Sequence, residues 1–77
     1  MKSYEITLNS IDKVKNFVNV VTSCEGDFDL SSGRYVVDAK SIMGIFSLDL
    51  TKTLKLDVYD DAVAGKIENS LKPFMAV

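Results

Sequence analysis

Four short runs of this chain alternate apolar with polar side chains, and they are separated by segments with a helical pattern. A two-residue period is typical of a half-buried strand, whereas apolar residues at three- and four-residue spacing indicate an amphipathic helix. The strand patterns are residues 3–9, 27–30, 34–39 and 54–59. This order, β-α-β-β-α-β-α, predicts an α+β fold: an open-faced two-layer sandwich, in which helices cover one face of a four-stranded antiparallel sheet. The pattern alone leaves the strand order open.

The first helix is expected to begin after Asn9 or Ser10, since either side chain can cap a helix. It is expected to stop near Gly26, which can adopt a left-handed conformation at a helix end. The predicted buried face consists of Ile11, Val14, Phe17, Val18, Val21 and Cys24. Residues 31–33, Ser-Ser-Gly, are predicted to form the turn of a hairpin.

The last helix is expected to begin after Asp60 or Asp61 and to be ended or kinked by Pro73. Gly65 lowers its helical propensity. Its predicted buried residues are Val63, Ile67 and Leu71. The few residues after this helix are expected to fray.

Size and composition limit the classes of function. The chain has 77 residues, which predicts one domain over residues 1–77. Nine basic and eleven acidic residues form no basic stripe, so we expect no nucleic-acid partner. No apolar run is long enough to span a membrane. The single cysteine, Cys24, excludes an intramolecular disulfide and is predicted to be a buried structural thiol; with no signal-peptide pattern, it indicates a cytoplasmic protein.

The chain contains no histidine, and this excludes any phosphohistidine on it. With one cysteine and no histidine, the sequence does not predict a zinc site, and it has no calcium-loop motif. We therefore expect no metal and no cofactor. The sequence pairs no nucleophile with a base and has no glycine-rich phosphate loop, so we expect that the protein is not an enzyme.

Residues 38–50, Asp-Ala-Lys-Ser-Ile-Met-Gly-Ile-Phe-Ser-Leu-Asp-Leu, resemble a motif of the HPr family. These are phosphocarrier proteins of the bacterial phosphoenolpyruvate-dependent sugar phosphotransferase system. The family's Lys-Ser-Ile-Met-Gly signature stands at residues 40–44, and Leu48 matches the leucine four residues beyond it. The resemblance implies an open-faced sandwich with the strand order 1-4-2-3.

The chain departs from this family at the phosphate carrier. HPr proteins carry phosphate on a histidine in a Gly-Ile-His-Ala-Arg-Pro loop that opens the first helix. Here residues 10–15 read Ser-Ile-Asp-Lys-Val-Lys, which places Asp12 at the degenerate phosphocarrier position. An aspartyl phosphate would need a magnesium site of clustered carboxylates, and only Asp12 is acidic in this stretch. The favourable interaction of an acidic first turn with the helix dipole already explains Asp12.

Ser41 has two compatible interpretations. It can cap the second, short helix through its hydroxyl oxygen. The resemblance also makes Ser41 the candidate for regulatory phosphorylation, because Gram-positive HPr and its catabolite-repression paralogue, which lacks the histidine too, are phosphorylated at this serine by an HPr kinase.

The apolar residues after Ser41 are too many for one short helix to bury. Ile45 and Leu48 are expected to face the sheet. We expect Ile42, Met43 and Phe46 to point outward, and Gly44 to allow close approach by a partner. In HPr the matching side chains dock enzyme I, the HPr kinase and a transcriptional regulator, the catabolite control protein. The alternative is that the third helix or a second copy covers them.

These observations predict a non-catalytic HPr-like protein that acts by protein binding, with Ser41 as a candidate regulatory site. A second hypothesis is a phosphotransfer component with another acceptor. A third is a small structural or oligomerising domain, such as a homodimer, that kept the HPr scaffold and left the sugar pathway.

Overall fold

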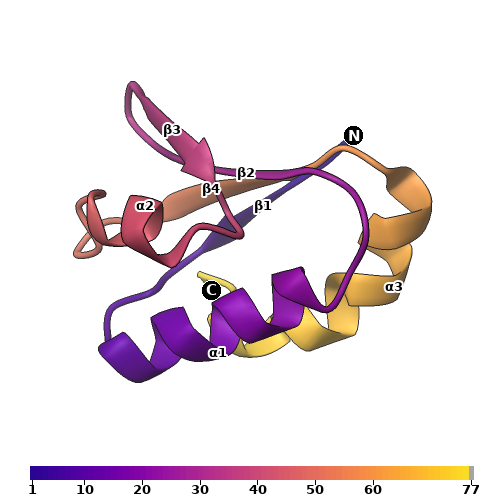
Figure 1. Cartoon of the computed structure of the whole chain (residues 1–77), viewed down its shortest axis with the longest axis horizontal. Coiled ribbons are helices and arrows are strands. Elements are labelled where there is room, and N and C mark those ends of the chain that lie inside the picture. Colours follow the sequence, from indigo (N-terminus) through magenta and orange to yellow (C-terminus); the bar gives the residue numbers. More distant parts are fainter. Residues whose placement is uncertain (77) are drawn as a thin grey trace.

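The computed structural model describes residues 1–76 and shows a four-stranded antiparallel sheet with helices on one face (Figure 1). The strands are β1 (Lys2–Ile6), β2 (Phe28–Ser32), β3 (Tyr35–Asp38) and β4 (Leu54–Val58). The helices are α1 (Ile11–Thr22), α2 (Ile42–Phe46) and α3 (Asp61–Leu71), followed by the 3-10 turn η1 (Lys72–Phe74). The predicted α+β sandwich is confirmed, and its strand order, β1-β4-β2-β3, is the one that the resemblance implied.

The central strands show why one face of the sheet is covered. Along β4, Leu54, Leu56 and Val58 are buried, while Lys55 and Asp57 alternate with them on the open face. The register places Tyr4 of β1 and Leu30 of β2 on either side of Leu56. A strand has a side-chain period of two, so this register puts the apolar side chains of all three strands on the same face.

The core lies between this face and the helices α1 and α3, which lie side by side beneath the sheet (Figure 1). The buried helical residues are Val14, Phe17, Val21, Ala64, Ile67 and Leu71. Ile11 was expected on this face, but its side chain is 62% exposed. Ile11 begins α1 and lies one turn before Val14, the first buried residue of the helix. Val63 is only partly buried, and Ala64 takes the central position.

All three α-helices begin at side-chain caps that the sequence had suggested. The Ser10 hydroxyl accepts a hydrogen bond from the backbone N–H of Lys13 at 3.1 Å. Asp60 caps α3 in the same manner, accepting from the N–H of Ala62 at 2.9 Å. Such bonds satisfy N–H groups that have no partner within the helix.

The end of α1 and the hairpin differ from the prediction. The helix ends at Thr22, where the hydroxyls of Thr22 and Ser23 bond back to backbone carbonyls one turn earlier. Cys24 therefore lies beyond the helix and is half-buried, which corrects the expectation of a buried helical thiol. Gly26 has a positive φ of 99°, but in the loop and not at the helix cap. The hairpin turn consists of Gly33, with φ 59°, and Arg34.

The C-terminal segment was expected to fray, but as far as residue 76 it pairs with the sheet. The α-helix ends before Pro73, as expected, and η1 then turns the chain toward β1. Met75 bridges to Ile6, and the Ala76 N–H donates to the Glu5 carbonyl at 2.9 Å. The Phe74 ring is 5% exposed and packs edge-to-face on Phe17, with 5.7 Å between ring centroids.

We predict that Phe74→Ala lowers the free energy of unfolding by about 3–5 kcal/mol, because it removes a buried ring and leaves a cavity. Urea denaturation followed by circular dichroism would measure it. The exposed neighbour provides the control: Lys72→Ala is expected to change stability by less than about 0.5 kcal/mol. Equal stability of the two variants would contradict the placement of Phe74 in the core.

Gly44 lies where α2 packs closely on β3. A Cβ at this position would lie 3.2 Å from the Cβ of Val37 and 3.2 Å from the hydroxyl oxygen of Ser41. Within the chain, Gly44 thus already allows one close approach, and the approach of a partner there stays a prediction. Gly65 of α3 differs, since a Cβ there would meet nothing within 4 Å.

We predict opposite effects of alanine at these two glycines. Gly65→Ala should stabilise the protein by about 0.5–1 kcal/mol, because alanine has the higher helix propensity. Gly44→Ala should instead destabilise it, since the new methyl group would lie unusually close to Val37 and Ser41 and would force a local shift between α2 and β3. Thermal unfolding of both variants beside the wild type checks this, and a stabilising Gly44→Ala would contradict it.

Candidate functional site

Ser41 stands at the start of α2 with its side chain exposed. Its hydroxyl oxygen accepts the N–H of Gly44 at 3.2 Å, and its carbonyl accepts the N–H of Ile45 at 3.0 Å. Its own N–H donates to the carbonyl of Asp38 at 2.9 Å, which ties the helix start to the end of β3. The capping role of Ser41 is therefore observed, and its phosphorylation stays a prediction.

Lys40, the first residue of the motif, has a role that the sequence analysis missed. Its ammonium group donates to the carbonyl of Cys24 at 2.8 Å and lies 5.4 Å from the centre of the Phe28 ring. Cys24 lies in the loop that joins α1 to β2, and Phe28 is the first residue of β2. Lys40 therefore holds this loop against the start of α2, and it belongs to the scaffold of the site.

The apolar side chains of α2 and of Leu48, which follows it, divide between the core and the surface. Ile45 and Leu48 are buried, as expected, at 0% and 7% exposure. Met43 and Phe46 are exposed, at 77% and 43%. Ile42 was expected to point outward with them, but it packs partly against the core. The reason is helical geometry, because residues three apart share a face and Ile42 precedes the buried Ile45 by three.

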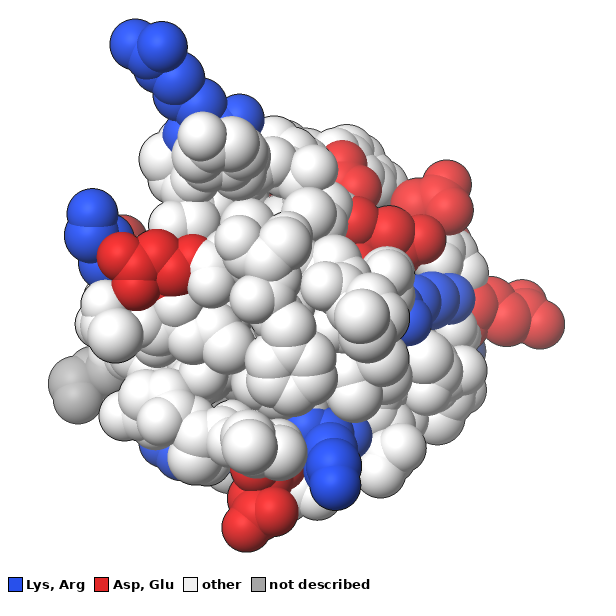
Figure 2. Space-filling model, turned by 60° about the vertical axis from the view of Figure 1, so that its left-hand side comes forward, with Lys and Arg blue, Asp and Glu red and all other residues white. Residues whose placement is uncertain are grey.

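A groove of about 370 Å³ lies between the start of α1 and the segment that follows α2. We call it the α1–α2 groove; it is lined by Leu8, Asn9, Ser10, Ile11, Phe46, Leu50 and Thr51. The tertiary fold thus brings the exposed Ile11 close to Phe46. Figure 2 views the molecule from the side of α2 and shows a broad central area without charged side chains, with lysine, arginine and acidic residues around its margin.

One wall of the groove is shaped by a turn at Asp49. Its carboxylate accepts hydrogen bonds from the hydroxyl of Thr51 and from the backbone N–H of Thr51, the latter at 3.1 Å. The hydroxyl bond is the main reason that the pKa of Asp49 lies below its usual value, with smaller contributions from the backbone bond and from Lys52. The turn places Thr51 at the groove.

Asp12 is exposed in the first turn of α1, next to Ile11 at the end of the groove. Within residues 1–76, no group of three or more His, Cys, Asp or Glu side chains is placed to hold a metal ion. In the same part of the chain, no helix combines the length and the apolar character that crossing a bilayer requires.

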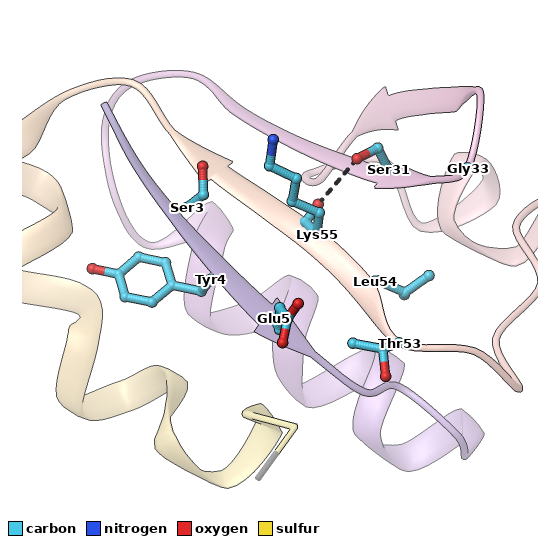
Figure 3. Close-up of a pocket in the computed structure, with 8 residues that line it drawn as sticks. All are labelled: Ser3, Tyr4, Glu5, Ser31, Gly33, Thr53, Leu54 and Lys55. Atoms are coloured by element: carbon cyan, nitrogen blue, oxygen red, sulfur yellow. Dashed lines mark hydrogen bonds between the residues drawn. The ribbon is translucent and has the colours of Figure 1, made fainter.

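The open face of the sheet carries a second hollow, of about 420 Å³ (Figure 3). Its lining is Ser3, Tyr4, Glu5, Ser31, Gly33, Thr53, Leu54 and Lys55. The one hydrogen bond drawn among them, from the Ser31 hydroxyl to the Lys55 carbonyl, is 3.5 Å long. The polar side chains in Figure 3 point in different directions and do not converge on a common point. We therefore take the α1–α2 groove as the candidate site.

Comparison with known proteins agrees with this fold. The crystal structure of HPr-C-His from Thermoanaerobacter tengcongensis is similar to this chain, with a TM-score of 0.75 and 28% sequence identity. The match covers 92% of this chain and 90% of that one. No protein-family model and no curated protein sequence matches the chain. The chain therefore has an HPr-like fold, and this fold suggests a relation to the phosphocarrier family.

Proposed function

We propose that this chain is a non-enzymatic HPr-like protein that acts by binding a protein partner at the α1–α2 groove. The observation that carries the proposal is the groove itself, which joins the exposed side chains of Ile11 and Phe46 on an HPr-like scaffold. Contiguous exposed apolar side chains generally mark an interaction surface. Met43, exposed on the same helix, adds a flexible side chain that adapts to a partner's shape.

The residue at the carrier position favours binding over phosphate transfer. The chain has no histidine, and the resemblance to the HPr family places Asp12 at the position of its phosphorylated residue. In the described part of the chain no carboxylate cluster accompanies Asp12 to hold the magnesium that an aspartyl phosphate uses. Incubation with phosphoenolpyruvate and enzyme I is therefore expected to add no phosphate, as intact mass would report.

We further propose that Ser41 regulates this surface, as the serine does in the catabolite-repression HPr that the chain resembles. The Ser41 hydroxyl is exposed at the start of α2, two residues before Met43. Phosphorylation there would place negative charge where a helix N-terminus tolerates it, and beside apolar side chains that a partner would contact. The proposed partners are an HPr kinase or a transcriptional regulator; a cytoplasmic location stays a prediction.

Binding can be tested with purified HPr kinase and catabolite control protein, titrated separately into the isotope-labelled chain and followed by NMR. We expect shifts at the α1–α2 groove. Met43→Ser and Phe46→Ser should each weaken binding about tenfold or more, because central apolar side chains supply most of the affinity of an interface. Tyr59→Ser is the matched control, since Tyr59 is 48% exposed on another part of the surface. Binding by neither protein, or equal weakening by the control, would contradict the proposal.

Phosphorylation can be tested by intact mass after incubation with an HPr kinase and ATP. We expect one phosphate on the wild type and none on Ser41→Asp, which keeps an oxygen that can cap α2. Ser47→Ala removes the exposed serine at the other end of α2 and should still accept phosphate. An unmodified but folded wild type would remove the regulatory part of the proposal and leave Ser41 as a cap.

A further inference from the structure

The two edges of the sheet are protected differently. At the β1 edge, the Ile6–Met75 bridge and the bond from Ala76 to Glu5 attach the C-terminal segment to the end of the strand. At the other edge, β3 pairs with β2 on one side, and no strand of residues 1–76 lies on its other side. An open strand edge presents backbone groups on which a further strand can pair.

The register identifies the backbone groups on the open side. The N–H of Ala39 donates to the carbonyl of Phe28 at 2.9 Å, so Ala39 bonds toward β2. Because the direction of these bonds alternates along an antiparallel strand, Tyr35 and Val37 also bond toward β2, and Val36 and Asp38 face away. The carbonyl of Asp38 accepts the N–H of Ser41. The N–H and carbonyl of Val36 and the N–H of Asp38 are left at the open edge.

The side chains of β3 do little to block this edge. Tyr35 is 75% exposed and Val36 is 61% exposed, and the strand contains neither lysine nor proline, two common protectors of strand edges. Helix α2 approaches β3 at Val37, whose side chain is on the helix-covered face of the sheet. The open edge is therefore both apolar and accessible.

The charges at the two ends of β3 indicate what would pair there. Arg34 precedes the strand and Asp38 ends it, and neither makes a salt bridge within residues 1–76. The register places Asp38 opposite Asp29, which in turn is opposite Asp57, so Asp38 ends a row of like charges. Asp57 has Lys55 at 3.7 Å and Asp29 accepts the Tyr59 hydroxyl, whereas Asp38 pairs with no cation among residues 1–76.

We propose that a second copy of this chain pairs antiparallel with β3, so that the two sheets join into one. In a symmetric pair centred on Val36, the two Val36 residues exchange backbone hydrogen bonds. The same register brings the hairpin turn of each copy, which carries Arg34, beside Asp38 at the end of the other β3, and this supplies the missing cation twice. The strand is short, so the interface is small and the association is weak and dependent on concentration. This inference does not depend on the proposed function.

Sedimentation velocity of the purified chain over a range of concentrations tests the proposal. We expect a reversible monomer–dimer equilibrium. Arg34→Asp and Asp38→Arg should each weaken it about tenfold or more, because each replaces two attractive pairs by two repulsive ones. An equimolar mixture of these two variants should dimerise again, since every pair then joins opposite charges. Lys66→Asp, which is on α3 and changes the net charge as Arg34→Asp does, should dimerise like the wild type.

The Asp38 carboxylate also accepts the N–H of Lys40 at 2.9 Å, and Asp38→Arg removes this bond. Two further variants therefore keep the test decisive if Asp38→Arg does not fold. Asp38→Asn keeps an acceptor oxygen and should still weaken the dimer. Val36→Pro removes an outward N–H, spares the bonds to β2, and should abolish association. A monomer at every concentration would overturn the proposal. A dimer that survives Arg34→Asp but is lost in Phe46→Ser would also overturn it, by placing the contact at the α1–α2 groove.

Discussion

The pairing of β4 with both β1 and β2 is the constraint on which the rest of the structure depends. β1 and β2 do not pair with each other, and β4 lies between them and pairs with both. The strand that unites them comes from residues 54–58, far from β1 in the sequence. The helices have a continuous apolar face to cover only once this pairing has formed, because the buried side chains of β4 lie at the centre of that face.

The position of α2 follows from contacts on three sides. Ile45 anchors it in the core, Gly44 allows it to approach β3, and Lys40 joins its start to the loop after α1. A helix of five residues has little stability of its own, so these tertiary contacts hold it in place. They also leave Phe46 exposed beside the start of α1, and the candidate surface is thus a consequence of how the scaffold is packed.

The sheet uses its own chain at one edge and leaves the other edge open. Phe74 carries the C-terminal segment into the core, which aligns the following backbone with β1. At β3 the chain turns directly into α2, and no segment of the described residues 1–76 returns to pair with the outer side of the strand. This asymmetry separates two surfaces of different chemistry: an apolar groove for side chains, and a strand edge with complementary charges at its ends.

The sequence by itself determined the type and order of the elements, because strand and helix periods and the capping residues Ser10, Ser41 and Asp60 act locally. It also determined that no histidine carries phosphate. It could predict that Met43 and Phe46 are exposed, because a short helix cannot bury every apolar side chain.

Only the tertiary structure decided which residues at the ends of these elements meet. Ile11 fits the apolar period of α1 but is exposed, because it precedes the first residue of α1 that is buried in the core. Ile42 was expected to point outward but packs partly against the core. Gly44 serves an internal contact with Val37, and Met75 pairs with Ile6 across almost the whole chain. Each outcome depends on where a segment that is distant in the sequence lies in space, and a local pattern of side chains does not specify that position.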